Sequence, residues 1–269
     1  MQSLSGRVAL VSGGSRGIGA GIVRCLARDG ADVAIVYRRD AEAAEAVAEE
    51  VRRLGRRALT VAADLRDGEA CAQAAAAALE RFGYVGLLVH NAGTSTKGFS
   101  AIETGDAEYD DALRIHCMAA IRLARALVPG MRARPRGDVI IVTSAIPFGG
   151  GGPGVAPYTL AKAAAEAFAH SLAHEERQHG IRVNVIRPGF TETEMGRRLS
   201  RSVTGSADLR QWDALAPFGR VEQPEDIGNA VAWLASAGGA YVTNQVICVD
   251  GGQATIGGVT DHIGSRLVR

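Results

Sequence analysis

The stretch Val8-Ala-Leu-Val-Ser-Gly-Gly-Ser-Arg-Gly-Ile-Gly19 decides the fold of this chain. It opens with four apolar residues, as expected of a strand that is buried on both faces. Gly13, Gly17 and Gly19 follow, and a run with helical periodicity begins at Ala20. Glycine lets the backbone approach a phosphate, and a helix N-terminus offers that phosphate unpaired N–H groups. The order of strand, glycine turn and helix favours a nucleotide-binding loop over a structural turn, although the spacing is neither Gly-x-Gly-x-x-Gly nor a P-loop.

Length and composition limit the possible classes of function. The 269 residues are enough for one large α/β domain with a full core. A formal net charge of +1 gives no strong field that would attract nucleic acid or an anionic membrane. The N-terminal residues contain no apolar signal core, no apolar run reaches membrane-spanning length, and the four cysteines are scattered. We therefore expect a single cytoplasmic domain over residues 1–269 with no metal, nucleic-acid or membrane partner.

Predicted strands and helices alternate along the chain after the glycine loop. The strands cover residues 31–36, 58–62, 87–93 with its turn, 138–143, 181–186 and 245–249. The helices cover residues 41–54, 68–82, 107–134, the segment that begins near Pro157, and 224–235. Asp40 and Asp106 are expected to cap two of these helices. The alternation predicts an α/β fold, a doubly wound parallel sheet whose ligand lies at the carboxyl ends of the strands.

Two arginines follow the second predicted strand, at the position where an NAD site usually has an acidic residue that holds the ribose 2′-OH. The strand ends at Tyr37, Arg38 and Arg39, and Arg16 lies in the glycine turn. Guanidinium groups suit a 2′-phosphate because they are always charged and bind it with two hydrogen bonds. We therefore expect NADP(H) rather than NAD(H). The alternative is a solvated basic loop that neighbouring carboxylates balance.

Polar residues also follow the third and fourth predicted strands. Asp64 can receive an adenine amino group or cap the next turn, and the sequence leaves both open. Asn91 can tie neighbouring strand ends together through its side-chain amide.

Three residues in the middle of the chain form a candidate catalytic set for proton transfer. Ser144 follows the fifth predicted strand, and Tyr158 and Lys162 share one face of the next helix. A lysine ammonium beside a phenol is expected to lower the pKa of the tyrosine toward neutrality. Such a tyrosine can donate a proton to a carbonyl oxygen or take one from an alcohol, and Ser144 can hold the same oxygen. Tyr-x-x-x-Lys alone also occurs on ordinary amphipathic helices, but the nucleotide loop and the serine make the set specific.

With these motifs the chain resembles the short-chain dehydrogenase/reductase family, from about Leu4 to Gly252. The further matching elements are Asn91-Ala92-Gly93, Arg187-Pro188-Gly189 with Thr191 and Thr193, Gly219-Arg-x-x-x-Pro-Glu-Asp226 and Val249-Asp-Gly-Gly252. The resemblance implies a Rossmann-like sheet of seven parallel strands flanked by helices. It also implies NAD(P)-dependent carbonyl reduction or alcohol oxidation, usually in a homotetramer.

The resemblance implies roles for individual residues as well. Lys162 is expected to bind the nicotinamide ribose, and Asp64, Leu65 and Asn91 to line the adenine side. Pro188, Gly189 and Thr191 are expected to contact the nicotinamide end. The expected cofactor-binding set is therefore Gly13, Ser15, Arg16, Gly17, Ile18, Gly19, Tyr37, Arg38, Arg39, Asp64, Leu65, Asn91, Ala92, Gly93, Tyr158, Lys162, Pro188, Gly189 and Thr191.

The chain departs from the family in two places. His116, seven residues after Tyr109, stands where the family usually has an asparagine on the proton-relay path behind the lysine. An imidazole can accept and donate through opposite nitrogens, and burial beside Lys162 should depress its pKa. The alternative is a packing histidine that is hydrogen-bonded to a carbonyl. The loop between Ser144 and Tyr158 is also slightly longer than usual, rich in glycine, and expected to be mobile without a ligand.

Two segments toward the C-terminus have less certain roles. In the family the segment that corresponds to residues 190–216 covers the substrate, and here it is polar, irregular and rich in arginine. Its arginines are expected on a solvated helix face, with binding of an anionic substrate as the alternative. The tail, residues 253–269, is expected to pack at a subunit interface or over a neighbour's pocket.

We therefore expect an NADP(H)-dependent reductase of a ketone or aldehyde, acting as a homotetramer or homodimer on a small molecule. Tyr158 would be the general acid/base, Lys162 would tune it, Ser144 would orient the substrate and His116 would join the relay. Two alternatives stay open: reduction of a C=N or C=C bond, and a dinucleotide-binding regulator without catalysis. The sequence does not identify the substrate or the physiological direction.

Overall fold

The protein is a twisted sheet between two layers of helices, seen here in a computed structural model that describes residues 3–146 and 151–252. Part of the glycine-rich loop and the whole 253–269 tail, for both of which the sequence made predictions, lie outside these residues. All strand pairs are parallel and follow the order β3-β2-β1-β4-β5-β6-β7, which confirms the predicted doubly wound, seven-stranded sheet. The strands are β1 (Val8–Ser12), β2 (Asp32–Tyr37), β3 (Ala58–Ala62), β4 (Leu87–His90), β5 (Gly137–Val142), β6 (Ile181–Pro188) and β7 (Val246–Val249).

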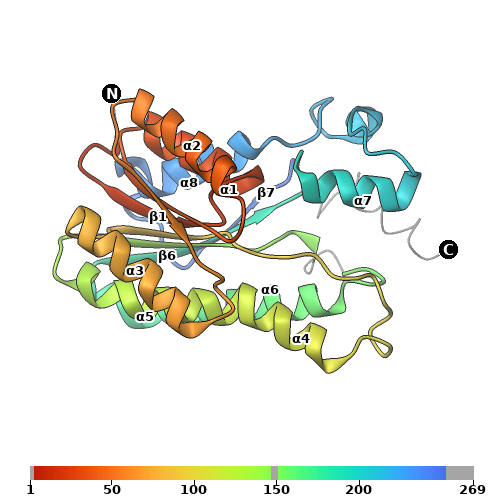
Figure 1. Cartoon of the computed structure of the whole chain (residues 1–269), viewed down its shortest axis with the longest axis horizontal. Coiled ribbons are helices and arrows are strands. Elements are labelled where there is room, and N and C mark those ends of the chain that lie inside the picture. Colours follow the sequence, from red (N-terminus) through yellow and green to blue (C-terminus); the bar gives the residue numbers. More distant parts are fainter. Residues whose placement is uncertain (1–2, 147–150, 253–269) are drawn as a thin grey trace.

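Helices cover both faces of the sheet (Figure 1). One layer holds α1 (Gly17–Arg28), α2 (Ala41–Arg53) and α8 (Pro224–Ala235), and the other holds α3 (Gly68–Phe82), α4 (Asp106–Leu113), α5 (Ala119–Arg132) and α6 (Ala156–Glu176). Each layer buries its own apolar cluster against the sheet, because both faces of parallel strands are apolar. The α1–α8 crossing is close: a Cβ on Gly21 would lie 2.5 Å from the carbonyl carbon of Pro224. No helix among the described residues is long and apolar enough to cross a membrane.

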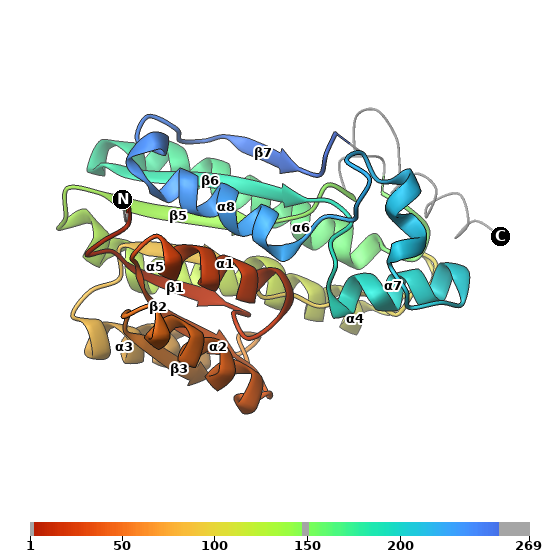
Figure 2. The ribbon, with the colours of Figure 1, turned by 90° about the horizontal axis from the view of Figure 1, so that it is seen from above.

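The carboxyl ends of the strands share one edge, which faces α7 (Glu194–Thr204) in Figure 2. At this edge the predicted bridge by Asn91 is confirmed, since its Nδ2 donates to the carbonyl oxygens of Ser12 at 3.2 Å and Gly13 at 3.3 Å. The Ser12 hydroxyl oxygen in turn accepts the backbone N–H groups of Asn91 and Ala92, each at 3.0 Å. The strand order reverses between β1 and β4, the place where ligands bind in open α/β sheets.

The long helix predicted over residues 107–134 is present from Asp106 to Arg132, but it is not α-helical throughout. The structure has α4, then a π-helical segment at Arg114–Met118, then α5. A π-helical turn carries an extra residue, which leaves carbonyl groups without their usual i→i+4 partners. The carbonyl oxygen of Ile115, in this segment, lies 3.2 Å from Nε2 of buried His90. The apolar stripe continues on both sides of the insertion, so the sequence pattern does not reveal it.

The two predicted helix caps have different outcomes. Asp40 caps α2, because its Oδ1 accepts the backbone N–H of Ala43 at 3.0 Å. Asp106 does not cap α4: Gly105 occupies the N-cap position, and Asp106 lies in the first turn. There its carboxylate still interacts favourably with the helix dipole.

Residues 190–216 form ordered structure rather than the irregular segment expected from their polarity. The Thr193 hydroxyl oxygen accepts the Gly196 N–H at 3.0 Å and so caps α7, and a 3₁₀ helix follows at Arg210–Leu215. A small apolar cluster holds the segment together, with Phe190 and Trp212 edge to face at its centre. Arg197, Arg198 and Arg210 pair with carboxylates of the same segment, Glu192 and Glu194 among them, as on an ion-paired helix face. Arg197 and Arg198 also line the cavity described below, so binding of an anionic substrate stays open.

Candidate functional site

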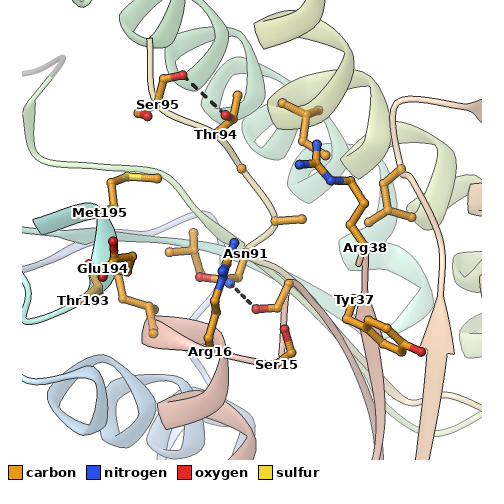
Figure 3. A pocket seen from close by; sticks show the side chains of 18 of the residues that line it. Ser15, Arg16, Tyr37, Arg38, Asn91, Thr94, Ser95, Thr193, Glu194 and Met195 are labelled. Carbon is orange, nitrogen blue, oxygen red and sulfur yellow. Dashed lines mark hydrogen bonds between the residues drawn. The ribbon is translucent and has the colours of Figure 1, made fainter. Parts of the chain in front are cut away.

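A cavity of about 870 Å³ lies at the carboxyl edge of the sheet, between the glycine loop, α6 and the start of α7 (Figure 3). Most of the residues singled out from the sequence line it: Gly13, Ser15, Arg16, Gly17, Ile18, Tyr37, Arg38, Arg39, Asp64, Leu65, Asn91, Ala92, Gly93, His116, Tyr158 and Lys162. Gly19, Ser144, Pro188, Gly189 and Thr191 are not part of its lining. A single cavity therefore holds the predicted dinucleotide loop together with the predicted tyrosine and lysine.

The glycine loop lines the cavity with backbone atoms at Gly13 and Gly17, where there is no side chain. Gly13 and Gly17 have φ angles of +66° and +54°, which favour glycine. Gly19 serves packing instead, since a Cβ there would lie 2.1 Å from the carbonyl oxygen of Gly13. At the N-terminus of α1, Arg16 takes an extended conformation and makes no side-chain cap. The first N–H groups of α1 therefore have no cap from the side chain at that position and can receive an anion such as a pyrophosphate.

Arg16, Arg38 and Arg39 line the cavity, and none of them forms an ion pair with another described residue. Figure 3 shows the Arg16 side chain beside Ser15 and the Arg38 side chain above Tyr37. One neighbouring carboxylate, Asp40, caps α2. Asp64 lies close enough to Arg38 for the Arg38 charge to lower its pKa, so part of the expected charge balance is present.

Asp64 caps its own turn, the second of the two roles left open. Its Oδ1 accepts the backbone N–H of Arg66 at 3.2 Å and the Arg66 guanidinium at 3.1 Å. Burial opposes ionisation, but these two hydrogen bonds and the Arg66 charge lower the pKa of Asp64 below its usual value. Arg66 also lines the cavity and pairs with Asp111 of α4. The sequence reasoning missed Arg66.

Tyr158 and Lys162 line the cavity, and Ser144 lies next to Tyr158 outside the lining. Lys162 is buried, its Nζ lies 5.6 Å from the centroid of the Tyr158 ring, and it donates a hydrogen bond of 2.7 Å to the Val142 carbonyl. Ser144 follows β5, is buried, and accepts the Ile146 N–H at 3.2 Å. Tyr158 and Ser144 also interact through a hydrogen bond between their side chains.

The expectation that Lys162 lowers the pKa of Tyr158 toward neutrality is wrong for this structure. Burial raises the pKa of Tyr158 above its ordinary value, and the hydrogen bond with Ser144 only partly opposes this. Burial also lowers the pKa of Lys162 to about 7. Removal from water penalises the charged form of each group, and it is the main cause of both shifts. Near neutral pH, Tyr158 therefore carries its proton.

His116 lies in the π-helical segment and faces Tyr158, edge to face, with ring centroids 5.2 Å apart. Its Nε2 is 3.0 Å from the Thr94 carbonyl oxygen, and its buried Nδ1 has no hydrogen-bond partner among the described residues. Burial and the nearby charge of Lys162 lower the pKa of His116 well below its usual value, as expected. Gly93 makes room for the ring, because a Cβ there would lie 2.4 Å from Cε1. The carbonyl contact matches a packing histidine, and the free Nδ1 leaves a position for a further partner.

The residues after β6 were expected to contact the nicotinamide end of the cofactor, but Gly189 and Thr191 make other contacts in the structure. Gly189 N–H and the Thr191 hydroxyl both donate to Oε2 of Glu222, at 3.0 and 2.6 Å, so neither donor faces the cavity. Thr193 lines the cavity instead, with its Cγ2 3.2 Å from the position of a Cβ on Gly17. Glu222 occupies an unspecified position of the element Gly219-Arg-x-x-x-Pro-Glu-Asp226, and only the fold brings it under residues 189–191. Other lining residues that the sequence reasoning missed include Thr94, Ser95, Thr143, Glu194 and Met195.

Comparison with known proteins gives consistent matches over almost the whole chain. A family model described as Enoyl-(Acyl carrier protein) reductase matches residues 13–254. Oxidoreductase UcpA of Escherichia coli is 33% identical over 255 residues, covering 94% of this chain and 96% of that protein. Among solved structures, a short-chain dehydrogenase/reductase from Serratia marcescens is 34% identical with a TM-score of 0.85, covering 94% of this chain and 100% of that one. L-Sorbose reductase from Gluconobacter frateurii, complexed with NADPH and L-sorbose, is 32% identical with a TM-score of 0.86, covering 95% and 99%.

Proposed function

We propose that this chain, which belongs to the short-chain dehydrogenase/reductase family of oxidoreductases, uses NADP(H) to interconvert a carbonyl compound and its secondary alcohol. One observation carries the proposal: a single cavity holds the glycine loop, the unpaired arginines, and Tyr158 beside Lys162. If the glycine segment were only a structural turn, and Tyr158 and Lys162 only part of an amphipathic helix face, there would be no reason for them to line the same cavity.

The cavity fits a phosphorylated dinucleotide. The bare backbone at Gly13 and Gly17 and the open N-terminus of α1 suit a pyrophosphate. Arg16 and Arg38 offer charge to a 2′-phosphate and have no competing ion pair among the described residues. The Gluconobacter relative, whose structure contains NADPH, agrees with this choice over NAD(H).

The protonation states favour the reductive direction. NADPH, when bound, supplies a hydride to the carbonyl carbon. Tyr158 holds its proton near neutral pH and can donate it to the carbonyl oxygen as negative charge develops there. Ser144 positions the same oxygen through its hydroxyl group. Lys162 stabilises the phenolate left on Tyr158, and its pKa of about 7 lets it return a proton near neutral pH.

His116 completes the proposed proton path. Its unpartnered Nδ1 is buried, and its ring edge meets the Tyr158 ring. A buried nitrogen without a partner is unfavourable, so we propose that a water molecule or the substrate binds there. The low pKa keeps the imidazole neutral, so one nitrogen accepts and the other donates.

We also propose that the chain forms one domain over residues 1–269 and acts as a homotetramer or homodimer on a small molecule. Large apolar side chains are exposed on several elements, among them Ile102 before α4, Leu160 of α6 and Trp233 of α8, and are available for contacts between subunits. Light scattering during size-exclusion chromatography would decide the oligomeric state.

The proposed activity is tested by NADPH oxidation with a panel of ketones, aldehydes, imines and enones. Consumption of NADPH with a ketone or aldehyde, and formation of the matching alcohol, would support the proposal. Turnover only with imines or enones would favour reduction of a C=N or C=C bond. Tight NADPH binding without turnover of any compound would favour a catalytically silent regulator.

A further inference from the structure

His90, the last residue of β4, is a buried histidine that the proposed mechanism does not use and that lies behind the lining of the cavity. Its Nδ1 lies 3.0 Å from the hydroxyl oxygen of Ser12, and its Nε2 lies 3.2 Å from the carbonyl oxygen of Ile115. The Ser12 hydroxyl oxygen also accepts the backbone N–H groups of Asn91 and Ala92, each at 3.0 Å. One imidazole ring therefore joins the carboxyl ends of β1 and β4 to the π-helical segment.

The hydrogen bonds around the His90 ring fit together in only one direction. Burial, followed by the charge of Lys162, lowers the pKa of His90 to about 3, so the ring is uncharged at neutral pH. An uncharged imidazole has one N–H donor and one acceptor nitrogen, and a carbonyl oxygen can only accept. Nε2 therefore carries the proton and donates to Ile115. Nδ1 accepts the hydroxyl proton of Ser12, whose oxygen already accepts two N–H groups.

The π-helical segment that His90 contacts also carries His116. Hydrogen bonds to the backbone of both Ile115 and His116 favour the charged form of His90, which places its ring against both residues. The His116 ring packs on Gly93, three residues after His90, where a Cβ would lie 2.4 Å from Cε1. The same ring meets the Tyr158 ring edge to face, with centroids 5.2 Å apart. A shift of the π-helical turn would therefore move the His116 ring relative to Tyr158.

We propose that His90 is a positioning residue, whose hydrogen bond to Ile115 holds the π-helical turn and thereby fixes the His116 ring against Tyr158. The effect on catalysis rests on the proposed function, in which His116 lies on the proton path, whereas the hydrogen bonds of His90 do not depend on that function. Proton transfer requires its groups to stay within hydrogen-bond reach, so release of the turn should lower kcat. Since His90 does not line the cavity, the affinity for NADPH should change little.

The test compares two substitutions that preserve different hydrogen bonds of the ring. Glutamine reaches the position of Nε2 and can still donate to Ile115, whereas asparagine reaches only that of Nδ1 and can still accept from Ser12. We expect His90→Gln to keep kcat for NADPH-dependent carbonyl reduction within about threefold of the wild type, and His90→Asn to lose about tenfold or more. The dissociation constant of NADPH should stay within about threefold for both. His179→Asn is the matched control, since His179 is exposed and lies before the start of β6, at the opposite edge of the sheet.

A double-mutant cycle shows whether His90 acts through His116. In a His116→Ala background, His90→Asn should lower kcat by less than about twofold, because the ring that His90 positions is absent. The proposal is wrong if His90→Asn lowers kcat by the same factor in both backgrounds. It is also wrong if His90→Asn keeps the wild-type kcat, or if His90→Gln loses as much as His90→Asn.

A ligand-free measurement separates this inference from the proposed function. In NMR spectra of protein with ¹⁵N-labelled histidine, we expect the His90 ring to be uncharged and protonated on Nε2 between about pH 6 and pH 8. His90→Asn should shift the ring signals of His116, and His179→Asn should not. If the protein reduces no carbonyl compound but His116 shifts in this way, the proposed function is wrong and the positioning role of His90 stands.

Unmoved His116 signals in folded His90→Asn would overturn the proposal. If that variant does not fold, the wild-type spectrum decides, with His90→Gln used to assign the His90 signals. A ring protonated only on Nδ1 has no proton to donate to Ile115 and would overturn the proposal, whereas a proton on Nε2 would support it.

Discussion

Replacing Arg38 with aspartate should change the cofactor preference of the protein. Arg38 follows β2, lines the cavity and has no ion pair among the described residues, so it is available to a 2′-phosphate. A charge-assisted hydrogen bond contributes about 1.5–3 kcal/mol, and an aspartate at this position also adds repulsion. We therefore expect the dissociation constant of NADPH to rise by about 10- to 100-fold. That of NADH, which has no 2′-phosphate, should change by less than about threefold.

The measurement is a fluorescence titration of both cofactors against wild type and variant, at constant ionic strength because the contact is exposed to solvent. Arg53→Asp, at the last turn of α2, is the matched control, since it makes the same change of charge outside the cavity lining. If Arg38→Asp weakens the binding of NADPH and NADH by the same factor, Arg38 does not bind the 2′-phosphate. A wild type that prefers NADH would refute the choice of NADP(H) itself.

Three further predictions follow from the geometry. Gly19→Ala should lower the free energy of unfolding by about 2 kcal/mol or more, seen in urea melts, because its Cβ would lie 2.1 Å from the Gly13 carbonyl oxygen; an unchanged midpoint would contradict this close packing. The kcat of His116→Asn should stay closer to that of the wild type than the kcat of His116→Ala, because an amide can still hold a partner at the position facing Nδ1. Similar kcat values for the wild type and both variants would mean that His116 is only a packing residue. Burial lowers the Lys162 pKa from 10.5 to about 7, so between these pH values the folded state binds fewer protons than the unfolded state, and the free energy of unfolding should rise with pH. If Lys162→Met shows the same dependence of the unfolding free energy on pH as the wild type, this prediction is wrong.

Much of the fold follows from sequence patterns that act locally. The apolar run at β1, the glycine turn and the Asp40 cap depend on neighbouring residues, so the sequence predicts them directly. The alternation of strands and helices predicted the shared edge where Asn91 bridges β1 and β4, and the resemblance to a family supplied the number of strands, seven. The order of these elements in the chain was therefore sufficient to predict where the cavity lies.

What the sequence missed depends on distant contacts or on backbone detail. The π-helical segment at His116 inserts a residue without interrupting the apolar stripe, so periodicity does not detect it. The raised pKa of Tyr158 reflects burial, which the spacing to Lys162 does not report. Glu222 and Thr191 lie 31 positions apart in the chain and meet only because β6 and the approach to α8 run side by side.

The central claim, that Tyr158 transfers the proton to a carbonyl oxygen, is tested most directly by Tyr158→Phe. This variant keeps the ring that packs against His116 and removes only the hydroxyl group. The decisive measurement is kcat for NADPH-dependent reduction of the best carbonyl compound, together with the dissociation constant of NADPH. We expect kcat to fall by about 10²–10⁴-fold while the dissociation constant stays within a few-fold of the wild type. If Tyr158→Phe retains more than about half of the wild-type kcat, Tyr158 is not the general acid.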